Sequence, residues 1–184
     1  MDEHQALIEA VYDIAAADDD LNPTVARIVE HSGLSNQAFY SHFASKDELL
    51  LAVLADGRHR LVGYLDHRMS GANSDVGAVE EWIRGVMAQT TDDTAAKRSR
   101  PFALQADRLA AQYPAENRRS VELLMDQFRG AVRAAAPTVS PAALEFAFWS
   151  CLAEMQRLLR TEHTPTDADI DSIVAVLTGG LGLE

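Results

Sequence analysis

The sequence predicts an all-α protein of about nine helices, three short ones near the N-terminus and then a bundle of longer ones. Alanine and leucine are abundant and runs of β-branched residues are few, which favours helices over strands. Apolar residues recur at helical spacing along most of the chain, and no segment has the pattern of a convincing strand. Capping residues, glycine or proline stand between these segments, as they do at helix ends.

The N-terminal segment contains three predicted helices. Residues 5–17 carry an apolar stripe with the i, i+4 and i+7 spacing of a helix. Asn22 and Pro23 are interpreted as an N-cap followed by proline at the first helical position, and Gly33 as the C-terminal cap of the same helix. Ser35 then caps a short third helix that ends near residue 41.

The later helices are expected to be longer. Ser45 and Glu48 match the S-x-x-E capping box at the start of a helix that reaches about residue 69. Residues 70–74 are a loop by composition, and the polar stretch 90–100 is also interpreted as a loop, with Pro101 beginning the next helix. The remaining helices are expected over residues 75–89, 101–113, 115–136, 141–160 and 166–178.

Composition excludes several classes of protein. There is no window of about 18 consecutive apolar residues, so no helix is expected to cross a membrane, and the acidic start lacks the features of a signal peptide. Cys151 is the single cysteine, which excludes an internal disulfide and fits a reducing compartment, so we expect a cytoplasmic protein. The six histidines never stand at H-x-x-x-H spacing, so we expect no metal site and no cofactor.

The charge of the chain is unfavourable for a nucleic-acid binder. The formal net charge is −12, and residues 1–50 hold ten acidic side chains against two basic ones, Arg27 and Lys46. Lys and Arg supply most of the phosphate neutralisation in such proteins. Any binding to DNA is therefore expected to be salt-limited and weak outside specific sites, with specificity resting on few contacts.

Residues 25–50 carry the most specific motif. Two short helices joined at Gly33 describe a helix-turn-helix, which alone is a weak signal because helical hairpins often turn at glycine. From Gly33 to Leu49 the sequence matches G-[VL]-S-x-x-x-[LF]-Y-x-H-F-x-[SN]-K-x-x-L at every fixed position. This string strongly resembles the DNA-binding domain of the tetracycline-repressor (TetR) family. The clear resemblance covers roughly residues 5–55, and beyond them only the length and the helical layout are similar.

The resemblance implies a sequence-specific DNA-binding transcription regulator that acts as a ligand-responsive repressor. It implies a helix-turn-helix domain over residues 1–48 and a helical domain for ligand sensing and dimerisation over residues 49–184. The expected partners are double-stranded DNA with a palindromic operator, a second copy of the chain in a homodimer, and a small-molecule effector of unknown identity.

The third helix is expected to contact bases. A recognition helix enters the major groove with its N-terminus first, which puts Ser35, Asn36 and Gln37 nearest the base edges. Asn and Gln amides can pair with the N6 and N7 edge of adenine. The alternative is that Asn36 and Gln37 are ordinary polar surface residues.

Four further residues are candidates for contacts to phosphate. Tyr40 and His42 lie on the solvent side of the third helix, and Lys46 lies at the start of the fourth, where its ammonium group and the helix end could share a phosphate. In the TetR family these three positions commonly hold the DNA backbone. Thr24 is either a further phosphate contact or only a helix cap.

The C-terminal half contains candidates for a dimer seam and for an effector pocket. The last two helices are strongly apolar, and in the TetR family such a pair forms a four-helix bundle with the partner; packing within one chain explains the pattern equally well. The seam candidates are Leu144, Phe148, Leu152, Met155, Leu159, Ile173 and Leu177. The pocket candidates, which could also be simple core, are Tyr64, Trp82, Met87, Phe102, Met125, Phe128 and Trp149, with His67, Gln105 and Arg108 as polar anchors.

Two other functions are alternatives to DNA binding. The acidic N-terminal half favours a helical, dimeric protein-interaction module in which the helix-turn-helix is vestigial. An enzyme is not expected, because the sequence contains no G-x-S-x-G, Walker or H-E-x-x-H motif.

Overall fold

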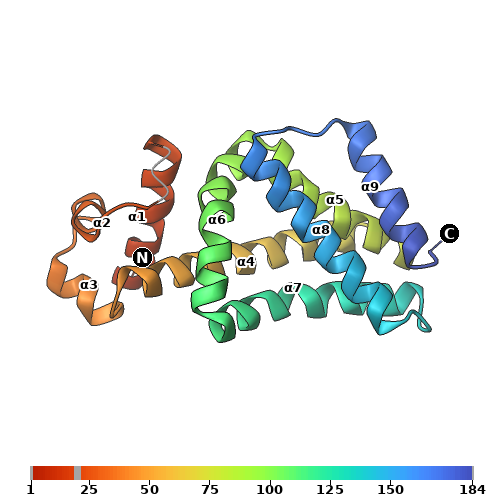
Figure 1. Ribbon diagram of the computed structural model, residues 1–184, viewed down its shortest axis with the longest axis horizontal. Helices are drawn as coiled ribbons and strands as arrows, with labels where there is room; N and C mark the ends of the chain where they lie inside the picture. The colour runs from red at the N-terminus through yellow and green to blue at the C-terminus, as the bar shows by residue number, and fades with distance from the viewer. Residues whose placement is uncertain (1, 19–21, 184) are drawn as a thin grey trace. The chain divides into compact units, whose positions relative to one another are not determined.

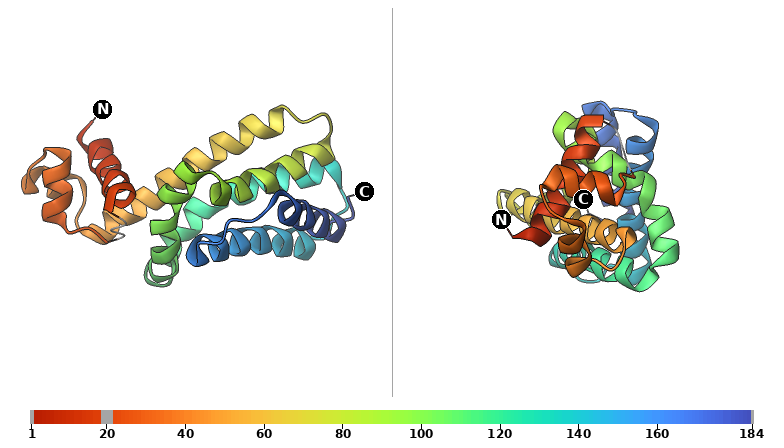
Figure 2. Two further views of the ribbon diagram at one scale, coloured as in Figure 1. Left: turned by 90° about the horizontal axis from the view of Figure 1, so that it is seen from above. Right: turned by 90° about the vertical axis from the view of Figure 1, so that its left-hand side faces the viewer.

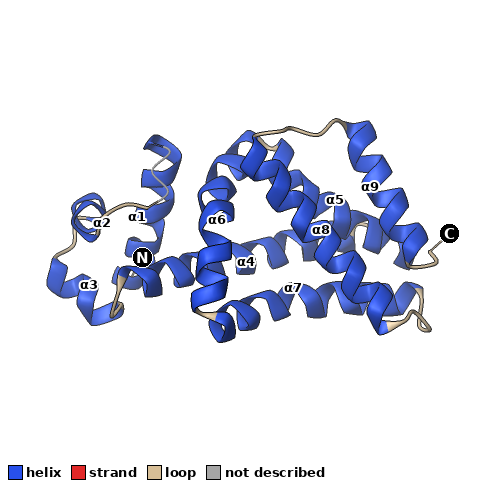
Figure 3. Cartoon of the chain, viewed as in Figure 1, coloured by secondary structure: helices blue, strands red, loops and turns tan. Residues whose placement is uncertain are grey.

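The computed structural model describes residues 2–18 and 22–183, except for the side chains of residues 98, 101, 102 and 104. Within these residues the chain forms nine α-helices and no strand, which confirms the predicted fold class (Figures 1 and 3). No helix in this part of the chain combines the length and the apolar character that crossing a bilayer requires. The helices are α1 (Glu3–Asp18), α2 (Val25–Ser32), α3 (Asn36–His42), α4 (Lys46–Ser70), α5 (Asp75–Thr91), α6 (Asp93–Gln112), α7 (Pro114–Ala135), α8 (Pro141–Thr161) and α9 (Asp167–Gly180).

One predicted boundary is wrong. The polar stretch 90–100 is not a loop, because α6 begins at Asp93 and Pro101 lies in its interior. The sequence holds the start signal that the prediction missed: a side-chain oxygen of Asp92 accepts the backbone N–H of Ala95 at 2.7 Å, as an N-cap does. Proline removes only one backbone donor from the helix, and alanine and lysine on its N-terminal side are good helix formers.

Two predicted caps form differently from the expectation. The N-cap of α2 is Thr24 rather than Asn22, since the Thr24 hydroxyl accepts the backbone N–H of Arg27 at 3.3 Å. At the start of α4, the Ser45 hydroxyl accepts the N–H of Glu48 at 3.1 Å, as the capping box predicts. The Glu48 carboxylate, however, accepts the backbone N–H of Ala44 at 2.6 Å instead of reaching back to Ser45.

The chain divides into two compact units. Unit 1 comprises Met1–Gly57 and Lys97–Arg119, and unit 2 comprises Arg58–Ala96 and Ser120–Glu184. The helix α4 contributes residues to both. These packing units do not coincide with the predicted division after residue 48, because the apolar residues that follow it in α4 belong to the core of unit 1. As a functional division, the predicted boundary stays a prediction.

The core of unit 1 holds the short helices α2 and α3 against α1 and the start of α4. Tyr12 adds a buried polar link, because its hydroxyl donates to the backbone oxygen of Val53 at 2.9 Å. The α6 segment contributes Leu109, which is 1% exposed, to the same core. The other core residues come from α1, α2, α3 with its C-cap, and α4, and include Leu7, Val11, Ile14, Ile28, Phe39, Phe43, Leu49 and Leu50.

Unit 2 is built around α5, which packs against α8 and α9, while α8 and α9 also lie side by side (Figure 2). Trp82 of α5 lies in its centre, with ring centroids 4.5 Å from Phe128 and 5.8 Å from Phe148. The indole N–H donates to Gln127 at 3.0 Å, so this buried donor is satisfied. Cys151 is fully buried here, and burial raises the pKa of its thiol, which favours the unreactive protonated form.

Replacing Gly33 with alanine should destabilise the protein. The backbone φ of +69° at this position costs an L-residue about 1–2 kcal/mol. No heavy atom lies within 4 Å of the position that a Cβ would take, so the loss would come from backbone strain alone. Chemical denaturation of the Gly33→Ala variant measures it.

The matched control is Gly63→Ala in α4. Its Cβ position is equally open, but its φ is not positive, so alanine there should stabilise the protein by about 0.5–1 kcal/mol. Equal effects of the two substitutions would contradict the strain argument.

Candidate nucleic-acid interface

A tight turn joins α2 to α3. Gly33 adopts the left-handed conformation at the C-cap of α2, and its N–H donates to the Glu30 carbonyl at 3.2 Å. The N–H of Leu34 donates to the Val29 carbonyl at 3.0 Å. These bonds satisfy carbonyl groups that a helix end leaves without intrahelical partners. The helix α3 then begins directly after Ser35, whose hydroxyl accepts a backbone N–H of the first turn at 3.1 Å.

The two sides of α3 differ sharply in burial. Phe39 is fully buried, and Phe43, which caps the helix, is 3% exposed; both pack into the core of unit 1. Tyr40 is 61% exposed. The residues predicted to meet DNA from this element are all exposed in the described chain: Ser35, Asn36, Gln37, Tyr40 and His42. The short helix therefore presents a polar side on which a partner could bind.

His42 is paired with an acidic residue of α1. Its Nε2 lies 3.1 Å from Oε2 of Glu3, a residue 39 positions earlier in the chain. The ring of His4 packs beside this pair, with its centroid 4.8 Å from that of Phe43 and 6.1 Å from that of His42. One of the two ring nitrogens of His42, the candidate donor to phosphate, therefore already faces a carboxylate.

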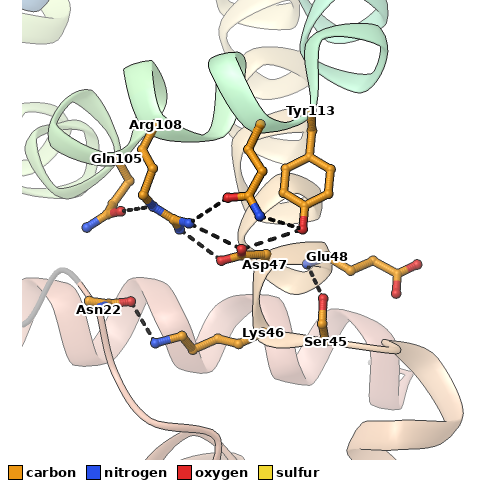
Figure 4. A network of polar contacts seen from close by, with 9 residues as sticks. Asn22, Ser45, Lys46, Asp47, Glu48, Gln105, Arg108 and Tyr113 are labelled. Carbon is orange, nitrogen blue, oxygen red and sulfur yellow. Dashed lines mark hydrogen bonds and ion pairs between the residues drawn. The ribbon is translucent and has the colours of Figure 1, made fainter.

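Lys46 and Thr24 also have partners within unit 1. The Lys46 ammonium group donates to Oδ1 of Asn22 at 2.7 Å (Figure 4). The exposed Thr24 caps α2, which is one of the two roles that the sequence left open. Its hydroxyl is the acceptor in that bond, so its hydrogen remains available to a second group.

Arg108 of α6 forms the main polar contact with the start of α4 (Figure 4). Its two terminal nitrogens donate to the two carboxylate oxygens of Asp47 at 2.8 and 3.2 Å, and its Nε donates to Gln105 at 3.1 Å. The Tyr113 hydroxyl donates to the same carboxylate at 3.5 Å. The hydrogen bond from Arg108 is the main reason that the pKa of Asp47 lies below its ordinary value. This bidentate pair fixes the residue next to Lys46.

The charge of unit 1 is less acidic than the N-terminal segment alone suggests. Residues 1–57 carry eleven acidic and two basic side chains, whereas residues 97–119 carry two acidic and six basic ones. Because the second segment belongs to the same compact unit, its basic side chains offset part of the acidic charge around the helix-turn-helix.

The predicted pocket residues do not share one environment. Trp82, Met87 and Phe128 are fully buried in the core of unit 2, and Met125 is 8% exposed. Tyr64 and Trp149 are exposed instead, at 40% and 51%. The side chain of Phe102 lies outside the described part of the chain. As an effector pocket, this set stays a prediction, and of its polar anchors Arg108 and Gln105 take part in the Asp47 network.

The predicted dimer residues pack mainly within their own chain, which is the alternative that the sequence left open. Met155 and Ile173 are partly buried against the core of unit 2, and the other five are buried: Leu144, Phe148, Leu152, Leu159 and Leu177. The exposed apolar side chains of α8 and α9 are different ones, namely Phe146 at 73%, Trp149 at 51% and Val176 at 72%. The role of the predicted set in a dimer stays a prediction.

Sequence reasoning missed the three polar contacts that hold the candidate DNA-binding residues in place. They join Glu3 to His42, Asn22 to Lys46 and Asp47 to Arg108, over separations of 39, 24 and 61 residues. No local spacing pattern signals such pairs, because each joins segments that are distant in the sequence and meet only in the folded unit.

Comparison with protein families identifies the N-terminal motif. Residues 21–53 match the model of the bacterial regulatory proteins of the tetR family. This segment contains α2, the turn, α3 and the first part of α4. Comparison with curated protein sequences finds no match.

Solved structures share the fold over nearly the whole chain. The multidrug binding protein EbrR in complex with imidazole has a TM-score of 0.73 at 16% identity, covering 98% of this chain and 96% of its own. RolR in complex with resorcinol has a TM-score of 0.72 at 18% identity, with coverage of 99% and 88%. The transcriptional regulator FadR from Bacillus subtilis in complex with stearoyl-CoA has a TM-score of 0.71 at 12% identity, with coverage of 96% and 98%. At such identities the likeness shows the fold.

Replacing Asp47 with asparagine should lower the stability of the folded protein by about 1 kcal/mol at neutral pH, the upper end for partly exposed ion pairs. Since the pKa of Asp47 is lowered in the folded state, its contribution is complete above the ordinary pKa of about 4 and is lost as the pH falls through the folded value. Thermal unfolding of wild type and variant at several pH values measures this, and the difference should shrink in acid.

The control for this effect is a double-mutant cycle with Arg108→Gln. Asp47 also lies in the first turn of α4, where a carboxylate stabilises the helix without any partner. If the ion pair is responsible, Asp47→Asn should cost clearly less in the Arg108→Gln background. An unchanged cost would assign the effect to the helix end.

Proposed function

We propose that this chain, a member of the tetR family of bacterial regulatory proteins, is a sequence-specific DNA-binding transcription regulator and acts as a ligand-responsive repressor in the cytoplasm. The observation that carries the proposal is the orientation of α3. Phe39, together with Phe43 at the C-cap, is buried in the core of unit 1, whereas the residues proposed to meet DNA, Tyr40 among them, are exposed. A helix of this kind can enter the major groove of a duplex.

The N-terminal end of α3 reads the bases in this proposal. Asn36 and Gln37 are exposed in its first turn, and their amides can both donate to and accept from the edge of an adenine. The Ser35 hydroxyl accepts a backbone N–H in its capping bond and keeps its own hydrogen for a base acceptor. Discrimination between bases then depends on these few contacts.

The phosphate contacts come from the residues around α3. Tyr40, His42, Lys46 and Thr24 each offer an O–H or N–H donor, and donors of this kind position a protein on the DNA backbone without reading sequence. Lys46 uses one of its three ammonium hydrogens for Asn22, which leaves two for a phosphate.

The proposed regulator is a homodimer that binds a palindromic operator. The support is that α8 and α9 carry large apolar side chains that are exposed in the single chain, namely Phe146, Trp149 and Val176. Large exposed apolar side chains on neighbouring helices are typical of a protein interface. Two copies would present two recognition helices to two half-sites, which doubles the number of contacts to DNA.

Unit 2 is the proposed effector-binding part. EbrR, RolR and FadR share this fold and are described in complex with imidazole, resorcinol and stearoyl-CoA. By analogy, a small molecule would bind among the apolar residues of unit 2 and shift the dimer to a state that binds DNA less tightly. Such an effector acts only through its different affinities for the two states.

Selection of bound sequences from a random DNA pool tests the proposal, since it should enrich a palindrome. The combined substitution of Lys46→Ala and Tyr40→Phe should weaken binding to the enriched sequence by about tenfold or more. The slope of log K against log salt should become less steep by about 0.9, for the one phosphate that Lys46 neutralises. Titration of a labelled duplex measures both.

The control Arg133→Ala removes an exposed positive charge from unit 2 and should leave affinity unchanged. Failure of the pool to enrich any sequence at low salt would favour a protein-interaction module.

The dimer surface is tested by Trp149→Glu. A charge placed among the exposed apolar side chains of α8 should weaken the proposed dimer by about 30-fold or more, and analytical ultracentrifugation would then show a monomer. The matched control is Leu123→Glu on α7, because Leu123 is exposed to a similar degree, at 49%. Equal effects of the two variants, or none, would contradict the α8–α9 surface.

A further inference from the structure

We propose that Glu3 competes with DNA phosphate for His42 and so lowers the affinity of the helix-turn-helix for the DNA backbone. The inference rests on the proposed function, because it needs His42 to meet DNA. It assigns to Glu3 a regulatory role within the same surface, as an acidic residue that occupies the place of a phosphate.

The first argument is the geometry of the pair. His42 is the last residue of α3, and its Nε2 lies 3.1 Å from a carboxylate oxygen of Glu3 in α1. A carboxylate and a phosphate present the same kind of negative acceptor oxygen to a ring N–H. One N–H group serves one such acceptor well, so a phosphate must displace Glu3 to take this bond.

The second argument comes from the contrast with Lys46. Its partner, Asn22, is a neutral amide that accepts one of three ammonium hydrogens. Asn22 can therefore orient Lys46 without repelling a phosphate. His42 offers far fewer donors, and its partner is charged. Of the two pairs, only the one with Glu3 opposes the approach of DNA.

The third argument is electrostatic. Glu3 is 56% exposed, and its pairing with His42 places it at the end of α3, the helix proposed to meet DNA. Two like charges about 4 Å apart in water repel with an energy equivalent to about fivefold in a binding constant. Salt reduces this repulsion, because the Debye length is about 10 Å at 0.1 M. The effect of Glu3 should therefore be largest at low ionic strength.

The test measures binding of a labelled duplex of random sequence at about 50 mM salt, where phosphate contacts dominate affinity. Glu3→Gln keeps the size of the side chain and removes its charge, and it should bind about fivefold tighter than wild type. Glu116→Gln makes the same charge change at an exposed position of unit 1 and should gain less than about twofold. Glu3→Ala should match Glu3→Gln, and circular dichroism verifies that each variant is folded.

The Glu3→Gln substitution in a His42→Ala protein shows whether Glu3 acts through His42. In a His42→Ala protein the gain from Glu3→Gln should be clearly smaller, because the contact for which Glu3 competes is absent and only the direct repulsion between Glu3 and phosphate remains. A gain that persists there in full, or a Glu3→Gln variant no tighter than Glu116→Gln, overturns the proposal. Lys46→Ala in the same assay tests the DNA-binding function separately from the role of Glu3. If Lys46→Ala weakens binding while Glu3→Gln has no effect, only the role of Glu3 is contradicted. If wild type and all variants show no salt-dependent binding, the DNA-binding function fails.

Discussion

Burial of two aromatic side chains, Phe39 and Phe43, is the contact on which the recognition surface depends. The helix α3 has seven residues, and a helix this short is not stable in water by itself. Full burial of one phenylalanine contributes about 1.5–3 kcal/mol, enough to hold such a helix against its neighbours. The exposed side of α3 is therefore ordered because the opposite side is buried, and the stability of the fold and the position of the polar residues have the same origin.

Local signals in the sequence were sufficient to predict most of this region. Gly33 and Ser35 end one helix and begin the next through bonds that span only a few residues, and the structure has both. The helix start predicted at Pro101 is wrong because α6, capped by Asp92, already begins at Asp93 and continues through the proline. The contact of Asp47 with Arg108 could not be predicted, since it joins residues 61 positions apart and depends on where α6 packs.

The C-terminal half shows a second limit of sequence patterns. Periodicity indicated that α8 is apolar, but the helix has two apolar sides with different environments. Phe148 lies in the core of unit 2, while its neighbour Trp149 and Phe146, two positions before it, are exposed. Spacing alone does not tell which apolar side is covered by the same chain, and only the tertiary packing separates the interior set from the exposed one.

The discontinuous composition of unit 1 has a consequence for its synthesis. Leu109 completes the core of unit 1, and Arg108 completes the polar contact at the start of α4. Arg108 follows its partner Asp47 by 61 residues, and most of the residues between them belong to unit 2. A nascent polypeptide can form α1 to α3 early on the ribosome, yet it must wait for residues 97–119 before this unit can close. Until then, the apolar surface that Leu109 covers is open to water and to chaperones.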